Sequence, residues 1–331
     1  MMKKILLINT GGTFSSRPGE NGLTPALSSE EIGTLLGGFD PALSITPEDL
    51  CSLDSSNITP DHWRTLALRI GEDVERWDGV VLIHGTDTMA YTASMLSFML
   101  QNIPIPVVLT GSQMPLGVPM SDAADNLRCA LQMAASGRGG VFVAFDRKIM
   151  LGCRTSKVRT VSFNAFESIN YPYVGEVNAF GLQLRLEEAP PAGPFRLQVD
   201  YSDRISVLKL FPGMDPDIFR FLQERGYEGI YIEGFGLGGV PFLKSDFTAE
   251  IRRASQSGLP ILVGSQCRYE GSNLSVYETG QRILDCGGIP VHDMTQEAVV
   301  TKLMWCLGQS KRREDIQKLF RENLVQEVRV P

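Results

Sequence analysis

One stretch, residues 80–94, most constrains what this chain can fold into. It begins with four apolar residues that predict a short buried strand, followed by a glycine, several hydroxyl groups and one carboxylate. Apolar residues then recur at helical spacing, which predicts a helix from about Thr86 or Asp87. The polar cluster therefore lies where a strand ends and a helix begins. In open α/β sheets ligands bind at such places, and the amides of a helix N-terminus favour negative charge.

The same strand-then-glycine pattern occurs twice more in the first half of the chain. Apolar residues 5–8 lead into Thr10-Gly11-Gly12-Thr13, and residues 107–109 lead into Thr110-Gly111-Ser112. Predicted helices separate these strands, and such alternation favours parallel strands joined by crossovers. We therefore predict an α/β protein with two domains, each a mostly parallel sheet flanked by helices. The larger N-terminal domain is predicted to be of flavodoxin-like or Rossmann-like type.

A segment rich in proline and glycine divides the chain. Residues 186–203 contain Pro190-Pro191 and Gly193-Pro194 and form the predicted linker. This division assigns an N-terminal domain to residues 1–185 and a C-terminal α/β domain to residues 204–331. Further buried strands, and then a mostly helical segment, are predicted in the second domain at residues 205–210, 229–232, 260–263 and 295–327.

Composition argues against several kinds of partner. The net charge of −7 gives no reason to expect nucleic acid or an anionic membrane surface as a partner. No apolar stretch is long enough to cross a bilayer, and the run Ile5 to Ile8 is too short for a signal peptide, so we expect it to be the first strand. The six cysteines form no CxxC pair and lie mostly in apolar segments, which predicts reduced core residues in a cytoplasmic protein. The three histidines lie far apart, so no metal site of histidine and cysteine is expected.

Two threonines are the candidate nucleophiles. Thr13 and Thr86 each follow a predicted buried strand. If both strands belong to one parallel sheet, both hydroxyls lie at its carboxyl edge and face a common pocket. A threonine hydroxyl is a poor nucleophile near neutral pH and needs a base. The candidates are Asp87, adjacent to the second threonine, and Lys157, which lies in a segment that also carries Arg154 and Arg159.

Each of these features also has a simpler structural explanation. The Gly11-Gly12 pair is typical of a turn or a phosphate loop, and Thr86-Asp87 alone can be a helix cap. A single lysine such as Lys157 is more often a surface residue. His84 has no serine or cysteine nucleophile motif around it, so packing beneath the loop is the favoured interpretation. Residues 54–56 have the character of a loop that caps a helix.

Taken together, the motifs resemble those of the bacterial-type L-asparaginases, and most closely the cytoplasmic type I branch. The most specific is the run from His84 to Ala93, combined with Thr10-Gly11-Gly12-Thr13 at the expected distance. Further similar runs extend the resemblance over nearly the whole chain: Asp54-Ser55-Ser56, Thr110-Gly111-Ser112-Gln113, Arg154-Thr155-Ser156-Lys157, Ala165-Phe166-Glu167-Ser168 and Thr301-Lys302-Leu303.

The resemblance implies a role for each candidate residue. Thr13 matches a threonine on a mobile loop that is usually taken as the primary nucleophile. Thr86, Asp87 and Lys157 match a second threonine and its partners, with the lysine as proton acceptor. The sequence does not decide which threonine attacks first.

The resemblance also implies how a small zwitterionic substrate is held. The turn at residues 54–56 matches the one that binds the α-carboxylate, and Asp87 matches the residue that binds the α-ammonium. Backbone N–H groups near Thr86 suit the tetrahedral oxyanion. The residues predicted to bind substrate are Asp54, Ser55, Ser56, Thr86 and Asp87, and those predicted to form the oxyanion loops are Gly12, Gly85 and Ser112.

The chain departs from the family pattern at two positions. In many relatives, the loop after the first threonine closes over the substrate and carries a tyrosine near the position of Leu23, where it assists that threonine. A leucine side chain cannot form a hydrogen bond. The role of the tyrosine is therefore absent here, or another group fills it. Some type I members bind asparagine at an allosteric site that includes an arginine near the position of Glu233. A glutamate reverses the charge expected to bind a carboxylate, so the same effector site is not expected here.

The implied reaction is hydrolysis of L-asparagine to L-aspartate and ammonia through a threonine acyl-enzyme. It requires no cofactor and no metal. Relatives are homodimers or homotetramers, but the sequence does not give the oligomeric state. It also does not rank asparagine against glutamine, because one methylene changes pocket fit by only about 1–3 kcal/mol.

Other function classes stay open on the sequence. A binding or sensing protein would hold asparagine or aspartate without turnover, but it needs no pair of nucleophile and base. A subunit of a tRNA-dependent amidotransferase would release ammonia for a partner; such subunits usually carry an extra N-terminal domain, whereas the first predicted strand here starts at Lys3. A dinucleotide-binding Rossmann domain is disfavoured because no GxGxxG follows that strand.

Overall fold

The computed structural model describes residues 2–19, 22–35, 40–185 and 193–329, and for Leu23 and Leu35 the backbone alone. Contacts divide the chain into two compact units, Met1–Gln198 and Val199–Pro331. Part of the predicted linker, residues 186–192, lies outside the described residues. Across the described part of the chain, no helix is both long and apolar enough to cross a bilayer.

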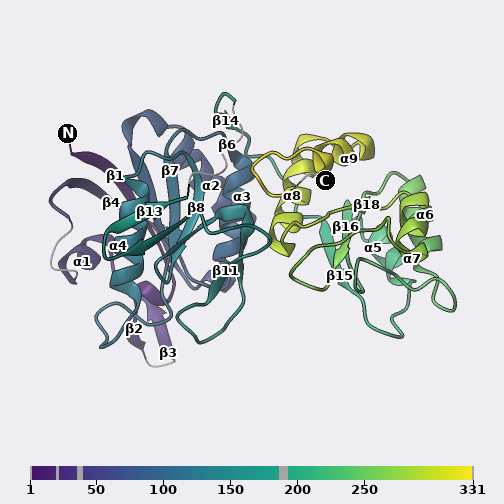
Figure 1. Ribbon diagram of the computed structural model, residues 1–331, viewed down its shortest axis with the longest axis horizontal. Coiled ribbons are helices and arrows are strands. Elements are labelled where there is room, and N and C mark those ends of the chain that lie inside the picture. The colour runs from purple at the N-terminus through teal and green to yellow at the C-terminus, as the bar shows by residue number, and fades with distance from the viewer. Residues whose placement is uncertain (1, 20–21, 36–39, 186–192, 330–331) are drawn as a thin grey trace. The chain divides into compact units, whose positions relative to one another are not determined.

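The first unit is built around an eight-stranded sheet in the order β13-β12-β9-β8-β7-β5-β1-β4 (Figure 1). Neighbouring strands from β4 to β8 pair in parallel, and β9, β12 and β13 are added antiparallel. The strands are β1 Lys3–Gly11, β4 Leu43–Leu53, β5 Gly79–Ile83, β7 Pro106–Thr110, β8 Gly140–Phe145, β9 Lys148–Leu151, β12 Gly175–Asn178 and β13 Gly181–Leu184.

The order of the five parallel strands determines where a ligand can bind. Numbered along the chain as parallel strands they are ordered 2-1-3-4-5, which is the flavodoxin-like arrangement. The order reverses between β1 and β5, which lie side by side with Asn9 opposite Ile83. Ligands bind outside the carboxyl ends of the strands at such a reversal. Both predicted catalytic threonines follow these two strands.

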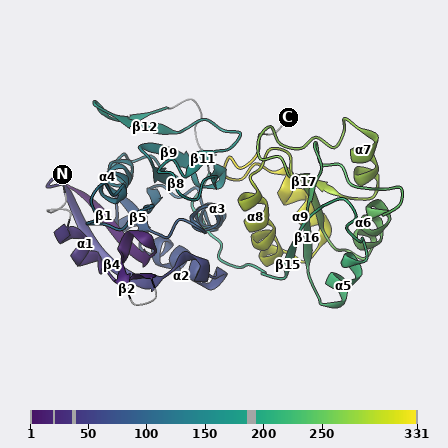
Figure 2. The ribbon, with the colours of Figure 1, turned by 90° about the horizontal axis from the view of Figure 1, so that it is seen from below.

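Helices cover both faces of this sheet, with α1 and α4 on one side and α2 and α3 on the other (Figure 2). Helix α1 begins with the predicted capping box: Ser28 Oγ accepts the N–H of Glu31 at 3.2 Å, and the Glu31 carboxylate accepts the N–H of Ser28 at 2.9 Å. Helix α2 has Pro60 at its first position, as predicted. The helices are α1 Ser29–Leu35, α2 Pro60–Gly71, α3 Met89–Met99 and α4 Ala123–Ala134, with short 3₁₀ turns η1 Thr13–Ser15, η2 Ser55–Asn57, η3 Val74–Arg76 and η4 Gly152–Arg154.

Three small antiparallel pairs complete the first unit. Residues 14–25 are rich in Ser, Gly and Pro, which predicts a loop; in the structure this segment contains η1 and then a hairpin in which Arg17 pairs with Thr24. Residues 155–168 contain a second hairpin, and β14, within the predicted linker, pairs with β6. The strands are β2 Ser16–Gly19, β3 Gly22–Pro25, β6 Leu100–Gln101, β10 Thr155–Lys157, β11 Phe166–Ser168 and β14 Arg196–Leu197.

Strand β4 is the main element that the sequence did not predict. Residues 51–58 were expected to be a polar turn region, but 51–53 are the end of this eleven-residue strand. It lies at the edge of the sheet, where only one side of the ladder is paired. An edge strand tolerates Pro47 and needs no continuous apolar run, so its sequence lacks the signal of a buried strand.

The second unit contains a four-stranded parallel sheet in the order β15-β16-β17-β18. Helix α8 packs on one face, and α5, α6 and α7 lie on the other (Figure 2). Together with the first unit, this confirms the predicted two-domain α/β class. The elements are β15 Ile205–Lys209, β16 Gly229–Gly234, β17 Ile261–Ser265, β18 Ile289–Pro290, α5 Ile218–Glu224, α6 Phe247–Gln256, α7 Glu278–Asp285, α8 Gln296–Gln309 and α9 Arg313–Arg321.

A fully buried ion pair holds the segment after α9 against α8. The side chains of Lys302 and Glu327 are both 0% exposed, and the ammonium contacts the carboxylate directly. The ammonium also donates to the carbonyl of Glu322 at 2.8 Å, and the carboxylate accepts the N–H of Val325 at 2.8 Å. Both charges are therefore compensated where water cannot reach them, as burial of charge requires.

We expect Lys302→Met alone to lower the free energy of unfolding by about 3–5 kcal/mol, because it leaves a buried carboxylate without its cation. The double variant Lys302→Met/Glu327→Gln removes both charges and keeps an acceptor for the backbone, so it should recover at least half of that loss. Urea denaturation of the wild type and of each variant measures both quantities. A double variant no more stable than the single one would contradict this account.

Candidate active site

Two glycines bring the segments that carry the predicted threonines into contact. Gly12 has a φ of 77°, and a Cβ at this position would lie 2.3 Å from the Cα of Gly85. Only glycine backbones can approach so closely. Thr13 directly follows the first glycine and Thr86 directly follows the second. The contact therefore brings both hydroxyl-bearing residues to the same end of β1 and β5.

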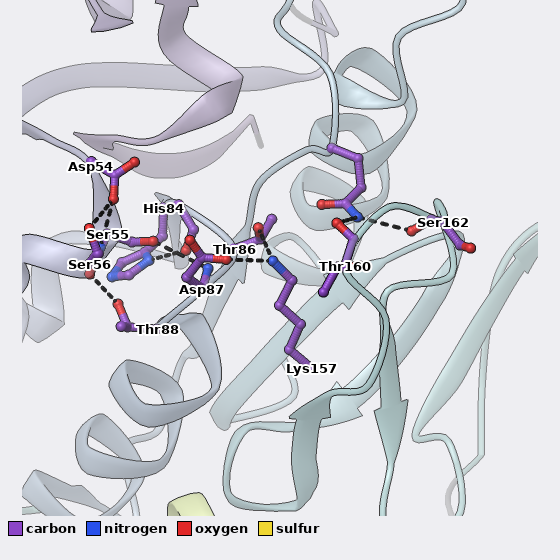
Figure 3. Close-up of polar contacts among 12 residues, drawn as sticks. Asp54, Ser55, Ser56, His84, Thr86, Asp87, Thr88, Lys157, Thr160 and Ser162 are labelled. Atoms are coloured by element: carbon purple, nitrogen blue, oxygen red, sulfur yellow. Dashed lines mark hydrogen bonds and ion pairs between the residues drawn. The ribbon is translucent and has the colours of Figure 1, made fainter. Parts of the chain in front are cut away.

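Lys157 connects the second threonine to the neighbouring carboxylate. Its Nζ donates to Thr86 Oγ1 at 2.8 Å and lies 2.6 Å from Asp87 Oδ1. In Figure 3, the lysine side chain approaches both groups from one side, and the turn with Ser55 and Ser56 lies on the other side of Asp87. The side chain of Lys157 is 18% exposed and that of Asp87 is 61% exposed. The carboxylate can therefore meet a ligand from solvent while the lysine stays largely covered.

The two arginines near Lys157 contact groups of the same part of the chain. Arg159 pairs with Glu167 across the β10–β11 hairpin at 2.6 Å. Arg154 is fully buried, with its guanidinium over the ring of Tyr171. Of the three cations in this segment, Lys157 thus contacts Thr86, whereas Arg154 and Arg159 contact other residues.

The turn at residues 54–56 supports the aspartate. Ser55 is buried; its Oγ accepts the N–H of Asp87 at 3.2 Å, and its carbonyl accepts the hydroxyl of Thr88 at 2.7 Å. The carboxylate of Asp54 accepts the N–H of Ser56 at 2.9 Å and the hydroxyl of the same serine, and these bonds lower the pKa of Asp54. The turn formed by residues 86–88 bonds to Ser55, so α3 begins only at Met89, later than predicted.

A buried chain of hydrogen bonds fixes the orientation of His84. Its Nδ1 lies 2.7 Å from the carbonyl of Gly85, which can only accept, so Nδ1 carries the proton. Its Nε2 therefore accepts the hydroxyl proton of Thr92 at 3.0 Å, and Thr92 Oγ1 accepts the indole N–H of Trp63 at 2.8 Å. Burial lowers the pKa of His84 to about 4, against an opposing effect of the Gly85 hydrogen bond. The imidazole is thus neutral and lies beneath the loop, as the sequence favoured.

The same hydrogen bond orients a backbone amide at the site. Because His84 holds the carbonyl of Gly85, the plane of the Gly85–Thr86 peptide is fixed, and the N–H of Thr86 points away from the histidine. Within the described residues this N–H makes no hydrogen bond. The N–H of Gly12, by contrast, donates to the carbonyl of Leu53 at 2.8 Å.

The loop after β7 contacts the same region. A Cβ at Gly111 would lie 2.3 Å from the carbonyl oxygen of His84, so the loop packs directly on the segment that carries Thr86. The hydroxyl of Ser112 donates to the carbonyl of Met114. In two of the three residues predicted for the oxyanion loops, the N–H of Gly12 and the hydroxyl of Ser112 therefore each donate to a backbone carbonyl.

Sequence reasoning missed Gln113 in this loop. Its side-chain amide donates to the carbonyls of Thr160 and Ser162, both at 3.1 Å. Gln113 had been noted only as part of a run that resembles the family. No local pattern links it to a loop some 47 residues further along the chain, so nothing in the sequence marked the contact.

Metal binding and the large cavity of the second unit were both compared with the predicted site residues. Among the residues that the structure describes, no three His, Cys, Asp or Glu side chains are grouped to hold a metal ion. A cavity of about 690 Å³ lies in the second unit and is lined mainly by glycine and apolar residues, including Phe235, Leu237 and Tyr277. None of the predicted site residues lines it, so the candidate active site is defined by the contacts of Thr86, Asp87 and Lys157.

Two family matches cover most of the chain. Residues 4–190 match "Asparaginase, N-terminal", and residues 204–320 match "Glutaminase/Asparaginase C-terminal domain". The chain belongs to the asparaginase family. The predicted family membership is therefore confirmed.

Individual members of the asparaginase family are similar over the full chain. The L-asparaginase of Thermococcus kodakarensis is 40% identical over 326 residues, which cover 98% of this chain and 99% of the relative. A subunit of the glutamyl-tRNA(Gln) amidotransferase of Pyrococcus abyssi is 35% identical over 340 residues, which cover 99% of this chain and 77% of the relative. Both kinds of protein thus align with nearly the whole length of this chain.

Solved asparaginase structures have the same fold. The thermostable L-asparaginase of Thermococcus kodakarensis superposes with a TM-score of 0.94 over 98% of this chain and 99% of that chain, at 40% identity. L-asparaginase I of Vibrio cholerae gives a TM-score of 0.88 over 99% and 100% of the chains, at 30% identity. These similarities extend over the whole α/β architecture and are not limited to the motifs.

The buried neutral imidazole makes a prediction about pH. The pKa of His84 is about 4 in the folded chain and near 6.5 when unfolded. Between these values the unfolded state binds the proton, so stability falls as pH decreases, by about 1.4 kcal/mol per pH unit and roughly 3 kcal/mol in all. The glutamine of His84→Gln does not titrate. Between pH 6.5 and 4, the unfolding free energy of this variant should therefore fall less steeply than that of the wild type, by about 1.4 kcal/mol per pH unit.

Urea denaturation at intervals from pH 7 to 4 measures both slopes. Carboxylate titration is common to the two proteins and cancels in the difference. Equal slopes in the wild type and the variant would contradict the assignment of a buried neutral His84.

Proposed function

We propose that this protein is an L-asparagine amidohydrolase that forms a threonine acyl-enzyme. The observation that carries the proposal is the contact of Lys157 with both Thr86 and Asp87, at 2.8 and 2.6 Å. This cluster combines the hydroxyl of Thr86, the proposed proton acceptor Lys157 and the proposed substrate-binding carboxylate of Asp87. It lies where the strand order of the parallel sheet reverses. The 40% identity to an L-asparaginase over nearly the full length supports the same activity.

The substrate is held by its two charged ends. Asp87 binds the α-ammonium, since its carboxylate is 61% exposed and Ser55 fixes its backbone. Ser56, with the backbone of its turn, receives the α-carboxylate, and Asp54 orients that serine through two hydrogen bonds. This geometry leaves the side-chain amide directed toward the threonines.

Acyl transfer then proceeds in two steps. A threonine oxygen, from Thr13 or Thr86, attacks the side-chain carbonyl carbon, and its proton passes to the amine of Lys157. The lysine then gives this proton to the amide nitrogen. The C–N bond breaks, and ammonia leaves. Water then attacks the ester and releases aspartate and the threonine hydroxyl. The N–H of Thr86, oriented through His84 and Gly85, donates to the oxyanion.

Several finer assignments belong to this proposal. We assign the catalytic threonines to a domain at residues 1–185, with a linker at 186–203 and a second domain at 204–331; the family matches at 4–190 and 204–320 support this division. We place the protein nearest the type I branch, in the cytoplasm, where its six free cysteines stay reduced. We propose a homodimer or homotetramer, which light scattering would test.

We expect purified wild-type protein to release ammonia from L-asparagine without any partner or tRNA. Thr13→Ala and Thr86→Val should each lower kcat by at least about 10³-fold, because each removes a hydroxyl that acyl transfer requires. A coupled ammonia assay measures the rates, and circular dichroism checks that the fold persists. Full activity in both variants would overturn the mechanism.

The same assay separates the alternatives. Ammonia release only in the presence of a partner would favour a role within an amidotransferase, a candidate because of the 35% identity to the Pyrococcus abyssi protein. Tight asparagine binding without ammonia, measured by calorimetry, would favour a sensing protein. Glutamine assayed beside asparagine gives the substrate preference as a ratio of kcat/KM values.

We expect initial rates to depend hyperbolically on asparagine concentration. The side chain of Glu233 is 5% exposed, and its pKa is raised, first by burial and further by nearby Glu297, against the opposing charge of Lys209. A buried acidic group does not pair with a carboxylate as an arginine does, so we do not expect the effector site of those type I relatives at this position. Steady-state kinetics with a Hill coefficient clearly above 1 would contradict the expectation.

A further inference from the structure

The lysine of the candidate site does not belong to the sheet that carries its threonine. Lys157 ends β10, which pairs with β11 in a separate two-stranded hairpin. Thr86 follows β5 in the eight-stranded sheet. The ladder of the main sheet therefore does not set the distance between the two residues, and other contacts must do so.

The loop directly after Lys157 has bonds of its own that do not reach the main sheet. The N–H groups of Val158 and Arg159 donate to the carbonyl of Ala165, at 2.8 and 3.2 Å. Arg159 also pairs with Glu167 on β11. These contacts close the loop of residues 158–165 on itself. At its other end, β10 follows the η4 turn, whose Gly152 carbonyl accepts the hydroxyl of Ser94 on α3 at 3.4 Å.

Gln113 connects the tip of this loop to the main sheet. Its Nε2 donates two hydrogen bonds to the tip, to the carbonyls of Thr160 and Ser162, each at 3.1 Å. An amide nitrogen has two N–H donors, and both are used on this one loop. The loop after β7, which packs against His84, is thereby tied to the hairpin that carries Lys157.

The backbone of Gln113 is itself rigidly held. The carboxylate of Asp122 accepts the N–H of Gln113 at 3.0 Å and that of Met114 at 3.1 Å. Asn126, on α4, donates to the same carboxylate and to the carbonyl of Gly111, both at 3.0 Å. A glutamine anchored in this way transmits the position of the main sheet to the loop, whereas a mobile one would not.

We propose that Gln113 is the positioning residue for Lys157. By fixing the loop after the lysine, it keeps the ammonium within hydrogen-bond distance of Thr86 and Asp87. This inference rests on the proposed function, because it gives the lysine its role as proton acceptor. Gln113 touches neither the lysine nor the threonine and acts through the backbone of the loop.

Gln113→Met tests the proposal, since it keeps the length of the side chain and removes both donors. We expect kcat for asparagine to fall about 10- to 100-fold, because small misplacement of a catalytic group is costly. KM and the calorimetric affinity for aspartate should change less than about threefold, since Asp87 and Ser56 are untouched. Gln113→His returns one neutral N–H at nearly the same reach and should recover part of kcat.

Gln183→Met is the matched control. Gln183 lies on β13, the strand at the other end of the sheet order from β1 and β5, and its amide donates to the carbonyl of Phe180 at 3.4 Å. Loss of this exposed bond should leave kcat unchanged. Thermal unfolding of all variants shows whether they are folded at the assay temperature.

Three results would overturn the proposal. They are a kcat of Gln113→Met within twofold of wild type, an equal loss of kcat in the control, and a weakening of aspartate binding as large as the fall in kcat. The last would make Gln113 a residue of general binding rather than of lysine positioning. A wild-type protein that releases no ammonia would overturn the proposed function itself, and the role of Gln113 with it.

Discussion

The contact between two glycine backbones is the constraint on which the candidate site depends. A Cβ on Gly12 would lie 2.3 Å from the Cα of Gly85, and a Cβ on Gly85 would lie 2.6 Å from the Oγ of Ser55. Three segments, from the ends of β1, β4 and β5, therefore meet where no side chain can be accommodated. Strand order also reverses at this point, which is where open α/β sheets bind ligands. A threonine directly after each glycine then lies at this reversal with no further adjustment of the chain.

The features predictable from sequence are those that local pattern determines. Apolar runs that end in glycine and hydroxyl residues marked β1, β5 and β7, and a shared sheet edge for Thr13 and Thr86 followed from parallel strands alone. Asp87 came with the second threonine because it is its neighbour. Lys157 was different: it lies 70 residues from Asp87 and on another sheet, so spacing never linked them. Its cationic segment made it one candidate base, and the family resemblance gave it the role of proton acceptor.

What the sequence did not reveal depends on contacts between distant segments. Strand β4 is an edge strand whose polar residues face solvent, so it carries no signature of burial. The hairpin at 16–25 has little apolar content and is defined by its own ladder. His84 and Gln113 share this property: each is an ordinary polar residue until tertiary structure gives it a partner, in one case Trp63 through Thr92, in the other the loop at 160–162. Such residues are visible only once the fold is known.

A single carboxylate lies between the lysine of the site and solvent. Asp87 pairs with Lys157 at 2.6 Å and is the more exposed of the two, with 61% of its side chain exposed against 18% for the lysine. Its backbone N–H donates to Ser55, which fixes the residue independently of the lysine. A carboxylate that is fixed at its backbone and exposed at its oxygens can pair with a second cation without moving. Under the proposed function that cation is the α-ammonium of asparagine, so the same carboxylate that pairs with the lysine also binds the substrate.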